Sequence, residues 1–310
     1  MTIENKNCPI CKKKSFNFYK TIESKITHIP GGLDRSYNEK IMVLKCKNCK
    51  LFKTFDLNND LNLEKIYTEE SISYEASLSK HNKLFDSSIT TDEFNLITKK
   101  APAKLLEIGC GAGQFLLRAN NKGYKSLGID LDKKAIDFVT NNLKLNAKNC
   151  KLIDLNENEK YDIVFLMGVF EHIEDPNQLL QEIKLRLKED GELIIGLPNA
   201  KSLNFYISNL GIDSWDMFLE PGHIYHYQKR NLKNLLSQYN FKLVSYKTGT
   251  VKIRGKIPFL VNRNVKLEKF VNKCVKGSKI IRWIYIMLLK FLDLFKMGDI
   301  LIASFKVNKI

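Results

Sequence analysis

The stretch AKLLEIGCGAGQFLLRA, residues 103–119, decides the fold that we expect for this 310-residue chain. Its apolar run predicts a strand over 104–108, its glycines predict a loop over 109–113, and the following residues predict a helix over 114–121. The alternation continues downstream, with strands expected at 123–130, 150–155, 161–170 and 192–199 and helices at 132–146 and 174–191. Within the last of these segments, the helix is expected to have Asp175 as its cap, Pro176 at its first position and Gly191 just past its end. Strands that alternate with helices predict a parallel, doubly wound α/β sheet, whose ligand lies at the carboxyl ends of the strands.

The spacing of the loop glycines indicates which ligand this is. A dinucleotide-binding loop has the pattern G-x-G-x-x-G, and its third glycine would fall at Gln114. The glycines are instead Gly109, Gly111 and Gly113, preceded by Glu107. This E-x-G-x-G-x-G string resembles motif I of the class I S-adenosylmethionine-dependent methyltransferases. Later positions of the same family are matched by Asp130, Asp154, GVFEHIEDP (168–176) and GHIYHYQKRNLKNLLSQYNFK (222–242), so the resemblance spans residues 103–250.

The resemblance implies both the fold and the methyl donor. The expected fold is a Rossmann-like, seven-stranded, mostly parallel sheet with helices on both faces, whose last two strands fall at 241–250 and 298–307 and are antiparallel. The donor is S-adenosylmethionine and the product is S-adenosylhomocysteine. Glu107 could instead be a solvated acid at a strand end, and the register of Asp154 stays open because other acidic residues lie close to it. The implied cofactor-binding residues are Glu107, Gly109, Cys110, Gly111, Gly113, Asp130, Leu131, Asp154, Met167 and Gly168.

Histidines are rare in this chain, and two of the five lie three residues apart in the segment 222–242. Methyl transfer to a hydroxyl benefits from a base that takes the hydroxyl proton, and histidine suits that role near neutral pH. We therefore expect His223 to be the base, with Tyr225, His226 or His172 orienting the acceptor. The alternative is that this segment only caps the cofactor cleft.

Two C-x-x-C pairs stand near the N-terminus, Cys8 with Cys11 and Cys46 with Cys49. Each pair can place two sulfurs on one tight turn, and two such turns build the tetrahedral four-thiolate site that suits zinc. Extended segments between the pairs predict a zinc-ribbon-like β module. The alternatives are a redox pair or thiols without metal, but a redox motif would not occur twice. A site with four protein ligands is closed, so we expect this zinc to be structural.

Charge divides the chain into three parts. Residues 1–55 carry 12 basic and 4 acidic side chains, residues 56–251 carry 24 and 27, and residues 252–310 carry 14 and 3, which together give the net charge of +16. Basic ends suit a phosphate-bearing partner such as a nucleotide-linked molecule, nucleic acid or an anionic membrane, although a lysine-rich composition alone also explains them. We expect the zinc module at 1–55, a helical connector at 56–100, the methyltransferase core at 101–250, a helical insert at 251–297 and the last core strand at 298–310.

The insert between the two last strands ends in IIRWIYIMLLKFLDLF, residues 280–295. A helix that is apolar on most sides has to be buried or lie in a membrane interface. We expect a lid or a dimer contact, in a monomer or homodimer; the alternative is peripheral membrane contact through residues 256–296. The chain has no N-terminal apolar run and no apolar stretch long enough to span a bilayer, so we expect a cytoplasmic protein, with membrane association as the alternative.

The order of zinc-binding pairs and methyltransferase core resembles bacterial methyltransferases of sugar and surface-polysaccharide pathways. This resemblance implies a small-molecule acceptor, namely a nucleotide- or lipid-linked sugar or glycan, in surface glycan biosynthesis. We expect O-methylation rather than C-methylation, because the large C-terminal domain of the C-methylating relatives does not follow. The alternatives are an RNA methyltransferase, disfavoured because the zinc module of those enzymes is shorter and uses a histidine, and a non-catalytic cofactor-binding scaffold.

Overall fold

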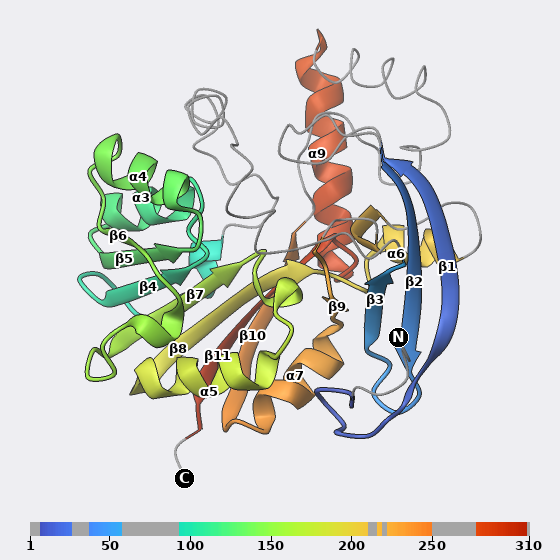
Figure 1. Cartoon of the computed structure of the whole chain (residues 1–310). Coiled ribbons are helices and arrows are strands. Elements are labelled where there is room, and N and C mark those ends of the chain that lie inside the picture. The colour runs from blue at the N-terminus through green and yellow to red at the C-terminus, as the bar shows by residue number, and fades with distance from the viewer. Residues whose placement is uncertain are drawn as a thin grey trace.

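The computed structural model describes residues 7–26, 37–57, 93–209, 216–218, 222–249 and 277–308. Most of the expected connector at 56–100, and the expected basic part of the insert at 251–276, lie outside these residues. Two sheets stand side by side, a large one built from the central and C-terminal chain and a small one built mainly from the N-terminus (Figure 1).

The large sheet has seven strands in the order β10-β11-β8-β7-β4-β5-β6. The neighbours among β4, β5, β6, β7 and β8 are parallel, whereas β11 is antiparallel to both β8 and β10. This is the expected Rossmann-like sheet with its antiparallel last strand. The strands are β4 (Lys104–Ile108), β5 (Lys125–Asp130), β6 (Ala147–Asn149), β7 (Tyr161–Met167), β8 (Leu187–Pro198), β10 (Phe241–Gly249) and β11 (Ile300–Val307).

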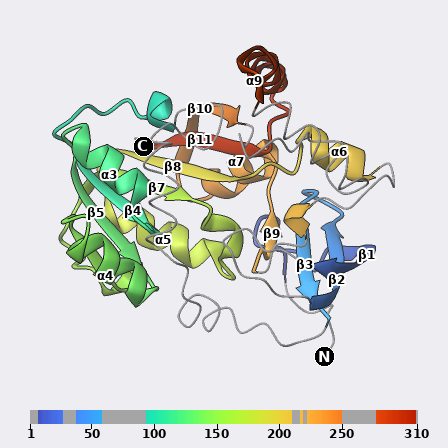
Figure 2. The same cartoon turned by 90° about the horizontal axis from the view of Figure 1, so that it is seen from above.

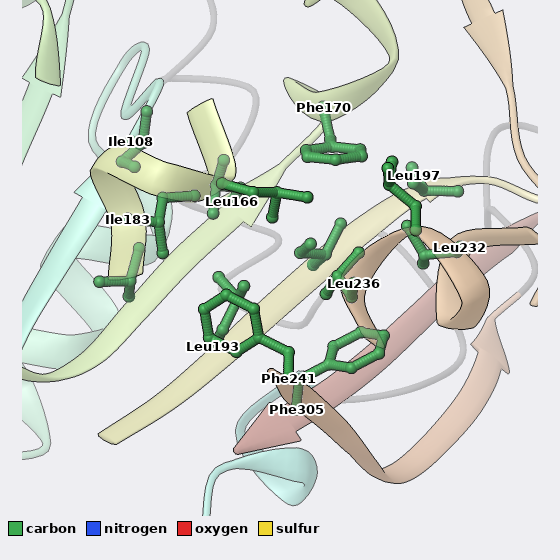
Figure 3. Close-up of a cluster of buried hydrophobic side chains, with 14 of the residues drawn as sticks. Ile108, Leu166, Phe170, Ile183, Leu193, Leu197, Leu232, Leu236, Phe241 and Phe305 are labelled. Carbon is green, nitrogen blue, oxygen red and sulfur yellow. The ribbon is translucent and has the colours of Figure 1, made fainter. Parts of the chain in front are cut away.

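Side chains that alternate along the buried strands pack against helices on both faces. On one face, Leu166 and Leu193 contact helices α5 (Pro176–Arg186) and α7 (Lys229–Ser237), as the core cluster in Figure 3 shows. On the other face, Leu105 and Phe165 contact Phe115 of α3 (Gln114–Asn121) and Leu96 of η1 (Glu93–Leu96). Helix α4 (Lys133–Asn141) packs against α3 near the edge of the sheet. A strand alternates its side chains between the two faces, so continuous apolar runs fill both layers.

Several sequence-based boundaries were wrong. The strand expected at 161–170 ends at Met167, and the helix expected at 132–146 ends at Asn141. The third strand is Ala147–Asn149, whereas the predicted strand at 150–155 contains the short 3-10 helix η2 (Leu152–Asp154). Helix α5 starts as predicted, with Asp175 accepting from the Asn177 and Gln178 backbones and Pro176 at its first position. It ends at Arg186 rather than near Gly191, because β8 begins at Leu187 and pairs there with Tyr161.

The small sheet joins the N-terminal segment to the core. Its order is β1 (Phe16–Ile26), β2 (Tyr37–Cys46), β3 (Phe52–Asp56) and β9 (Tyr225–His226), all antiparallel. The fourth strand comes from the core, so Phe52 pairs with His226 and Lys53 pairs with Tyr225. Phe52 also packs against Phe205 of α6 (Leu203–Asn209) and Phe218 of η4 (Asp216–Phe218), with ring centroids 5.3 and 5.9 Å apart. The N-terminal module is therefore part of one continuous core, beside the carboxyl ends of the large sheet (Figures 1 and 2).

Helix α9 (Lys279–Leu294) stands out from the body of the protein (Figures 1 and 2). Its Leu289 is buried and its C-terminal end packs beside β10, where Thr248 donates to the Asp293 carbonyl. Large apolar side chains elsewhere on α9 are exposed, including Trp283 at 62% and Phe291 at 56%. The described residues thus do not bury this helix as a lid on the core. Within the described part of the chain, the helices are too short or too polar to cross a membrane.

Candidate functional site

The glycine loop lies between β4 and α3, at the carboxyl end of the sheet. Gly109, Gly111 and Gly113 all have positive φ, which glycine adopts at no steric cost. A β-carbon added at Gly109 would lie 2.3 Å from Cγ2 of Val169 in the loop after β7. The loops after β4 and β7 are therefore in direct contact, and the close approach requires a glycine at position 109.

Glu107 is the buried acid of this loop. Its side chain is only 5% exposed, and its Oε2 atom has no hydrogen-bond partner among the described residues. Burial, followed by the charges of Asp130 and Glu93, raises the pKa of this carboxyl well above its usual range. A buried carboxylate oxygen that lacks a partner is costly, so the site fits a ligand that brings a cationic donor such as an ammonium group.

Asp130 ends β5 and holds the glycine loop. Its Oδ2 accepts from the Gly111 N–H at 2.8 Å, and its Oδ1 accepts from the Asp132 N–H at 2.9 Å. Each carboxylate oxygen can accept more than one hydrogen bond, so Asp130 can still bind the two hydroxyls of a ribose. Leu131, the next residue, is 41% exposed and can cover one face of an adenine ring.

The other expected cofactor residues occupy different surroundings. Cys110 is buried, with its sulfur close to Gly128. Met167 ends β7 with its side chain over Gly196, and Gly168 has positive φ and donates to the Gly196 carbonyl. Asp154 lies on η2, where its exposed carboxylate accepts from the Lys151 N–H at 2.8 Å. Its contact with adenine stays a prediction, and the residue is farther along the chain from β6 than the sequence indicated.

A second polar group, which we call the acceptor group, consists of Glu171, His172 and His223. Glu171 and His172 lie on η3 (Phe170–His172) after β7, directly following the Val169 that abuts Gly109. His223 comes from the loop before β9, and the two loops are joined because the Ile224 N–H donates to the Glu171 carbonyl at 2.9 Å. His223 Nε2 lies 3.9 Å from Glu171 Oε1, and the rings of His172 and His223 have centroids 4.6 Å apart.

Burial controls the protonation of both rings. It lowers the pKa of His172 to about 4. Burial, and then the neighbouring His172, lower the pKa of His223 to about 3. Both imidazoles are therefore neutral at pH 7, and each is a weak proton acceptor on its own. Glu171, a buried residue, is the third member. It was not among the site residues predicted from the sequence, although it belongs to the E-H pair.

His226 and Tyr225 lie deeper than His223. His226 is buried against Phe218, with the two ring centroids 4.7 Å apart. Its Nε2 donates to Thr54 Oγ1 at 3.1 Å. Tyr225 is 4% exposed and pairs with Lys53 of β3. The predicted role of these residues in orienting an acceptor stays a prediction, but their contacts also attach β9 to the small sheet.

Thr54 of β3 supports His223 from the N-terminal module. Its hydroxyl donates to the His223 carbonyl, and its backbone N–H donates to the Ile224 carbonyl at 3.1 Å. No local pattern marks this threonine, because its partners are 169 and 172 residues away in the sequence. Sequence reasoning therefore missed it.

The four N-terminal cysteines come together as expected. Cys8 Sγ lies 3.4 Å from Cys49 Sγ, and Cys11 Sγ lies 3.7 Å from Cys46 Sγ. All four sulfurs lie within 4.8 Å of one another. Four thiolates about 2.3 Å from one zinc ion would be separated by similar distances, so the donor set fits a structural zinc site.

Known proteins share the core of this chain. A family model described as a methyltransferase domain matches residues 83–246, which is 164 of the 310 residues. The ubiquinone biosynthesis O-methyltransferase of Pelagibacter ubique is 28% identical over 160 residues, covering 46% of this chain and 66% of that protein. The protein of the same name from Haemophilus ducreyi is 30% identical over 129 residues, covering 37% of this chain and 54% of that protein. This chain thus spans two thirds or less of the length of these relatives.

A solved structure shows the same fold. It is a methyltransferase from Haloferax volcanii, in complex with the Trm112 methyltransferase activator. The likeness has a TM-score of 0.52 at 12% identity, and it covers 76% of this chain and 96% of that one.

Proposed function

We propose that this chain, which belongs to the methyltransferase-domain family, transfers the methyl group of S-adenosylmethionine to a hydroxyl oxygen of a small acceptor. The observation that carries the proposal is the position of the acceptor group next to the glycine loop. Val169 contacts Gly109 on one side, and it is followed within three residues by Glu171 and His172 on the other. A donor pocket and a polar group therefore meet at one edge of the sheet, where ligands of such folds bind.

The donor pocket fits the charges of the cofactor. Glu107 offers a buried carboxylate oxygen to its ammonium group, and Asp130 offers acceptors to its ribose hydroxyls. S-adenosylmethionine supplies an electrophilic methyl group when it is bound. The glycines allow the backbone to approach the ligand closely, and no lysine lies in the loop, as suits a ligand that is itself cationic.

The acceptor group positions the hydroxyl that receives the methyl group. A neutral imidazole nitrogen can accept a hydrogen bond from that hydroxyl and orient its oxygen, which is the positioning that in-line displacement requires. We propose that His223 takes the hydroxyl proton when no metal ion lowers the pKa of the hydroxyl. Since burial makes the ring a weak base, the nearby Glu171 carboxylate at 3.9 Å has to assist it, or a cation has to lower the pKa of the hydroxyl.

For the acceptor we propose a sugar-type molecule that carries phosphate, such as a nucleotide-linked sugar of surface glycan biosynthesis. Two features support this choice: the zinc-module-and-core order, and the basic ends of the chain, which attract anionic molecules. The relatives are named for ubiquinone biosynthesis, so a dihydroxylated aromatic acceptor is the natural comparison. We further propose that zinc bound by the four cysteines has only a structural role.

The test is methyl transfer from a methyl-labelled cofactor to a panel of both acceptor types, read by mass spectrometry. We expect label on a hydroxyl oxygen of a nucleotide-linked sugar. The Gly109→Val variant, whose side chain would collide with Val169, should lose cofactor binding and serve as the inactive control. Transfer to the aromatic acceptors alone would reject the sugar assignment. Tight cofactor binding without transfer to any acceptor, in the panel or in extracts of glycans, would instead support a scaffold.

A further inference from the structure

The two histidines of the acceptor group are each held through one ring N–H. His223 Nδ1 lies 3.0 Å from the Met217 carbonyl oxygen, and since a carbonyl only accepts, Nδ1 carries the proton. The His172 ring is likewise hydrogen-bonded to the Gly222 backbone, in a contact that favours the protonated ring as a bond donated to a carbonyl does. Proteins orient metal-ligating histidines in this way, with the second ring nitrogen presented to the ion.

The remaining ligand atoms converge on one point. In the neutral tautomer of His223, the lone pair of Nε2 faces Glu171 Oε1 at 3.9 Å, which is too long for a hydrogen bond. The three ligand atoms of Glu171, His172 and His223 all lie within 4.8 Å of one another. Two ligands each about 2.1 Å from one ion can be at most about 4.2 Å apart. The distance between His223 Nε2 and Glu171 Oε1 is already within this limit. The largest distance between any two of the three ligand atoms has to shorten by no more than about 0.6 Å.

We infer that Glu171, His172 and His223 bind one divalent transition-metal ion of the Mn²⁺ or Zn²⁺ type. Two imidazoles and one carboxylate form a ligand set that leaves coordination positions open for substrate. The side chains of Glu171 and His223 are only 3% and 6% exposed, so the ion would be held away from bulk water. This site is distinct from the four-cysteine cluster, whose ligands fill a tetrahedral ion completely.

The role of the ion rests on the proposed function. A hydroxyl of the acceptor takes an open position, and the ion lowers its pKa so that near neutral pH the proton passes to a water molecule that enters with the acceptor, rather than to His223. The bound oxygen then forms its bond to the methyl carbon while the bond between that carbon and sulfur breaks. The electron pair of the broken bond stays on sulfur, which gives the methyl ether and S-adenosylhomocysteine. Neutral rings that are weak bases suit this arrangement, because they act as ligands and need not take the proton.

The test is a Mn²⁺ titration of the full-length chain, followed by electron paramagnetic resonance of the free ion. Mn²⁺ prefers carboxylate and imidazole to thiolate, so the cysteine cluster does not contribute. We expect one Mn²⁺ per chain, with an affinity that falls at least about 100-fold in Glu171→Gln and in His172→Gln, since loss of even a supporting residue costs 10–100-fold. Glu174→Gln makes the same chemical change at an exposed position three residues away and should leave the affinity unchanged.

Calorimetric binding of S-adenosylhomocysteine shows whether each variant is folded, and Glu171→Asp replaces Glu171→Gln if the latter does not fold. The inference is overturned if the wild-type chain binds no Mn²⁺, or if folded Glu171 and His172 variants bind it as tightly as the wild type. Metal binding without methyl transfer to any hydroxyl would reject the proposed function and leave the site intact. Transfer that persists after all Mn²⁺ and Zn²⁺ are removed from this site would reject its role and leave the function intact.

Discussion

The four-cysteine cluster and the acceptor group are both sets of metal-binding residue types, but they are built in opposite ways. The cluster draws Cys8, Cys11, Cys46 and Cys49 from two short turns at the ends of strands, and its four sulfurs are enough to fill a tetrahedral ion completely. The acceptor group draws three side chains that could bind a metal ion from two loops that are 52 residues apart, and one of these loops contacts the glycine loop through Val169. A closed set can stabilise a fold and an open set can bind a substrate, so the number of ligands separates the two roles. The two regions also touch, because β3 of the cysteine module pairs with β9 beside His223.

The largest expected effect is a loss of stability when one ligand of the four-cysteine cluster is removed. Cys46→Ser should remove zinc and lower the free energy of unfolding by more than about 4 kcal/mol, because structural zinc contributes about 10–16 kcal/mol in small zinc modules. Cys46 is fully buried, and its sulfur also accepts from the Cys49 N–H. Zinc content and denaturant unfolding are the measurements, and Cys150→Ser, a half-buried thiol outside the cluster, is the matched control. Unchanged zinc content in Cys46→Ser would mean that the cluster is not a metal site.

In the acceptor group, by contrast, we expect a substitution to lower the methyl-transfer rate and to leave cofactor binding nearly unchanged. His223→Asn keeps a donor for the Met217 carbonyl but removes Nε2, so the methyl-transfer rate should fall at least about 100-fold while the affinity for S-adenosylhomocysteine stays within about twofold. Single-turnover kinetics and calorimetry separate the two quantities. Full turnover in this variant would reduce His223 to a cap over the cofactor cleft.

A third prediction concerns the cofactor-binding side of the site, where the buried carboxyl of Glu107 should make stability depend on pH. In the folded protein its pKa lies well above the ordinary 4.5, so above that pH the unfolded chain binds fewer protons than the folded one and stability falls as the pH rises. Without cofactor, Glu107→Gln should therefore be more stable than the wild type at neutral pH, by about 1.4 kcal/mol for each pKa unit of the shift. The advantage should vanish below about pH 4.5, where both states of the wild type are protonated.

The same variant should bind S-adenosylhomocysteine more weakly by roughly 1.5–3 kcal/mol, the usual contribution of a hydrogen bond to a charged group. Thermal unfolding across pH and calorimetry provide the two measurements. If Glu107→Gln is less stable than the wild type at pH 7 and binds S-adenosylhomocysteine equally well, the Glu107 carboxylate does not bind the cofactor.

The smallest expected effect concerns Thr54, which connects the cysteine module to the segment around His223. Thr54→Val removes the hydroxyl that contacts both the His223 carbonyl and His226, at a cost of about 1–3 kcal/mol. Because this contact positions His223, the rate with acceptor should fall several-fold while cofactor affinity and zinc content do not change. Thr54→Ser keeps the hydroxyl and should restore the rate. Equal rates in Thr54→Val and Thr54→Ser would show that the Thr54 hydroxyl does not position His223.

Local signals predicted the donor half of the site well. The strand at 104–108 and the helix at 114–121 have the bounds expected from their apolar runs and glycines. The cysteine pairs were equally readable, since each pair is a four-residue pattern. Glu107 and Asp130 lie where a ligand of the expected kind would need them, although their contacts with it stay a prediction.

Non-local pairing explains what the sequence did not show. Strand β9 has only two residues and exists because β3 offers it an edge, so no periodicity announces it. The segment 150–155 is short and rich in apolar residues, which suggested a strand, yet Leu152 and Leu155 are buried from a 3-10 turn next to Arg186, which donates to the Ile153 and Leu155 carbonyls. The apolar helix near residue 285 was expected to be covered, and its described contacts leave most of its apolar face exposed.

The pairing of β3 with β9 has a consequence for genetics. The cysteine module resembles a separable appendage in the sequence, but Thr54 of its third strand donates hydrogen bonds to the backbone carbonyls of His223 and Ile224. Random mutagenesis that selects for loss of methylation should therefore return substitutions of Cys8 or Phe52 together with substitutions of His223. Suppressors of a damaged module should map to the segment 222–227, more than 160 codons downstream.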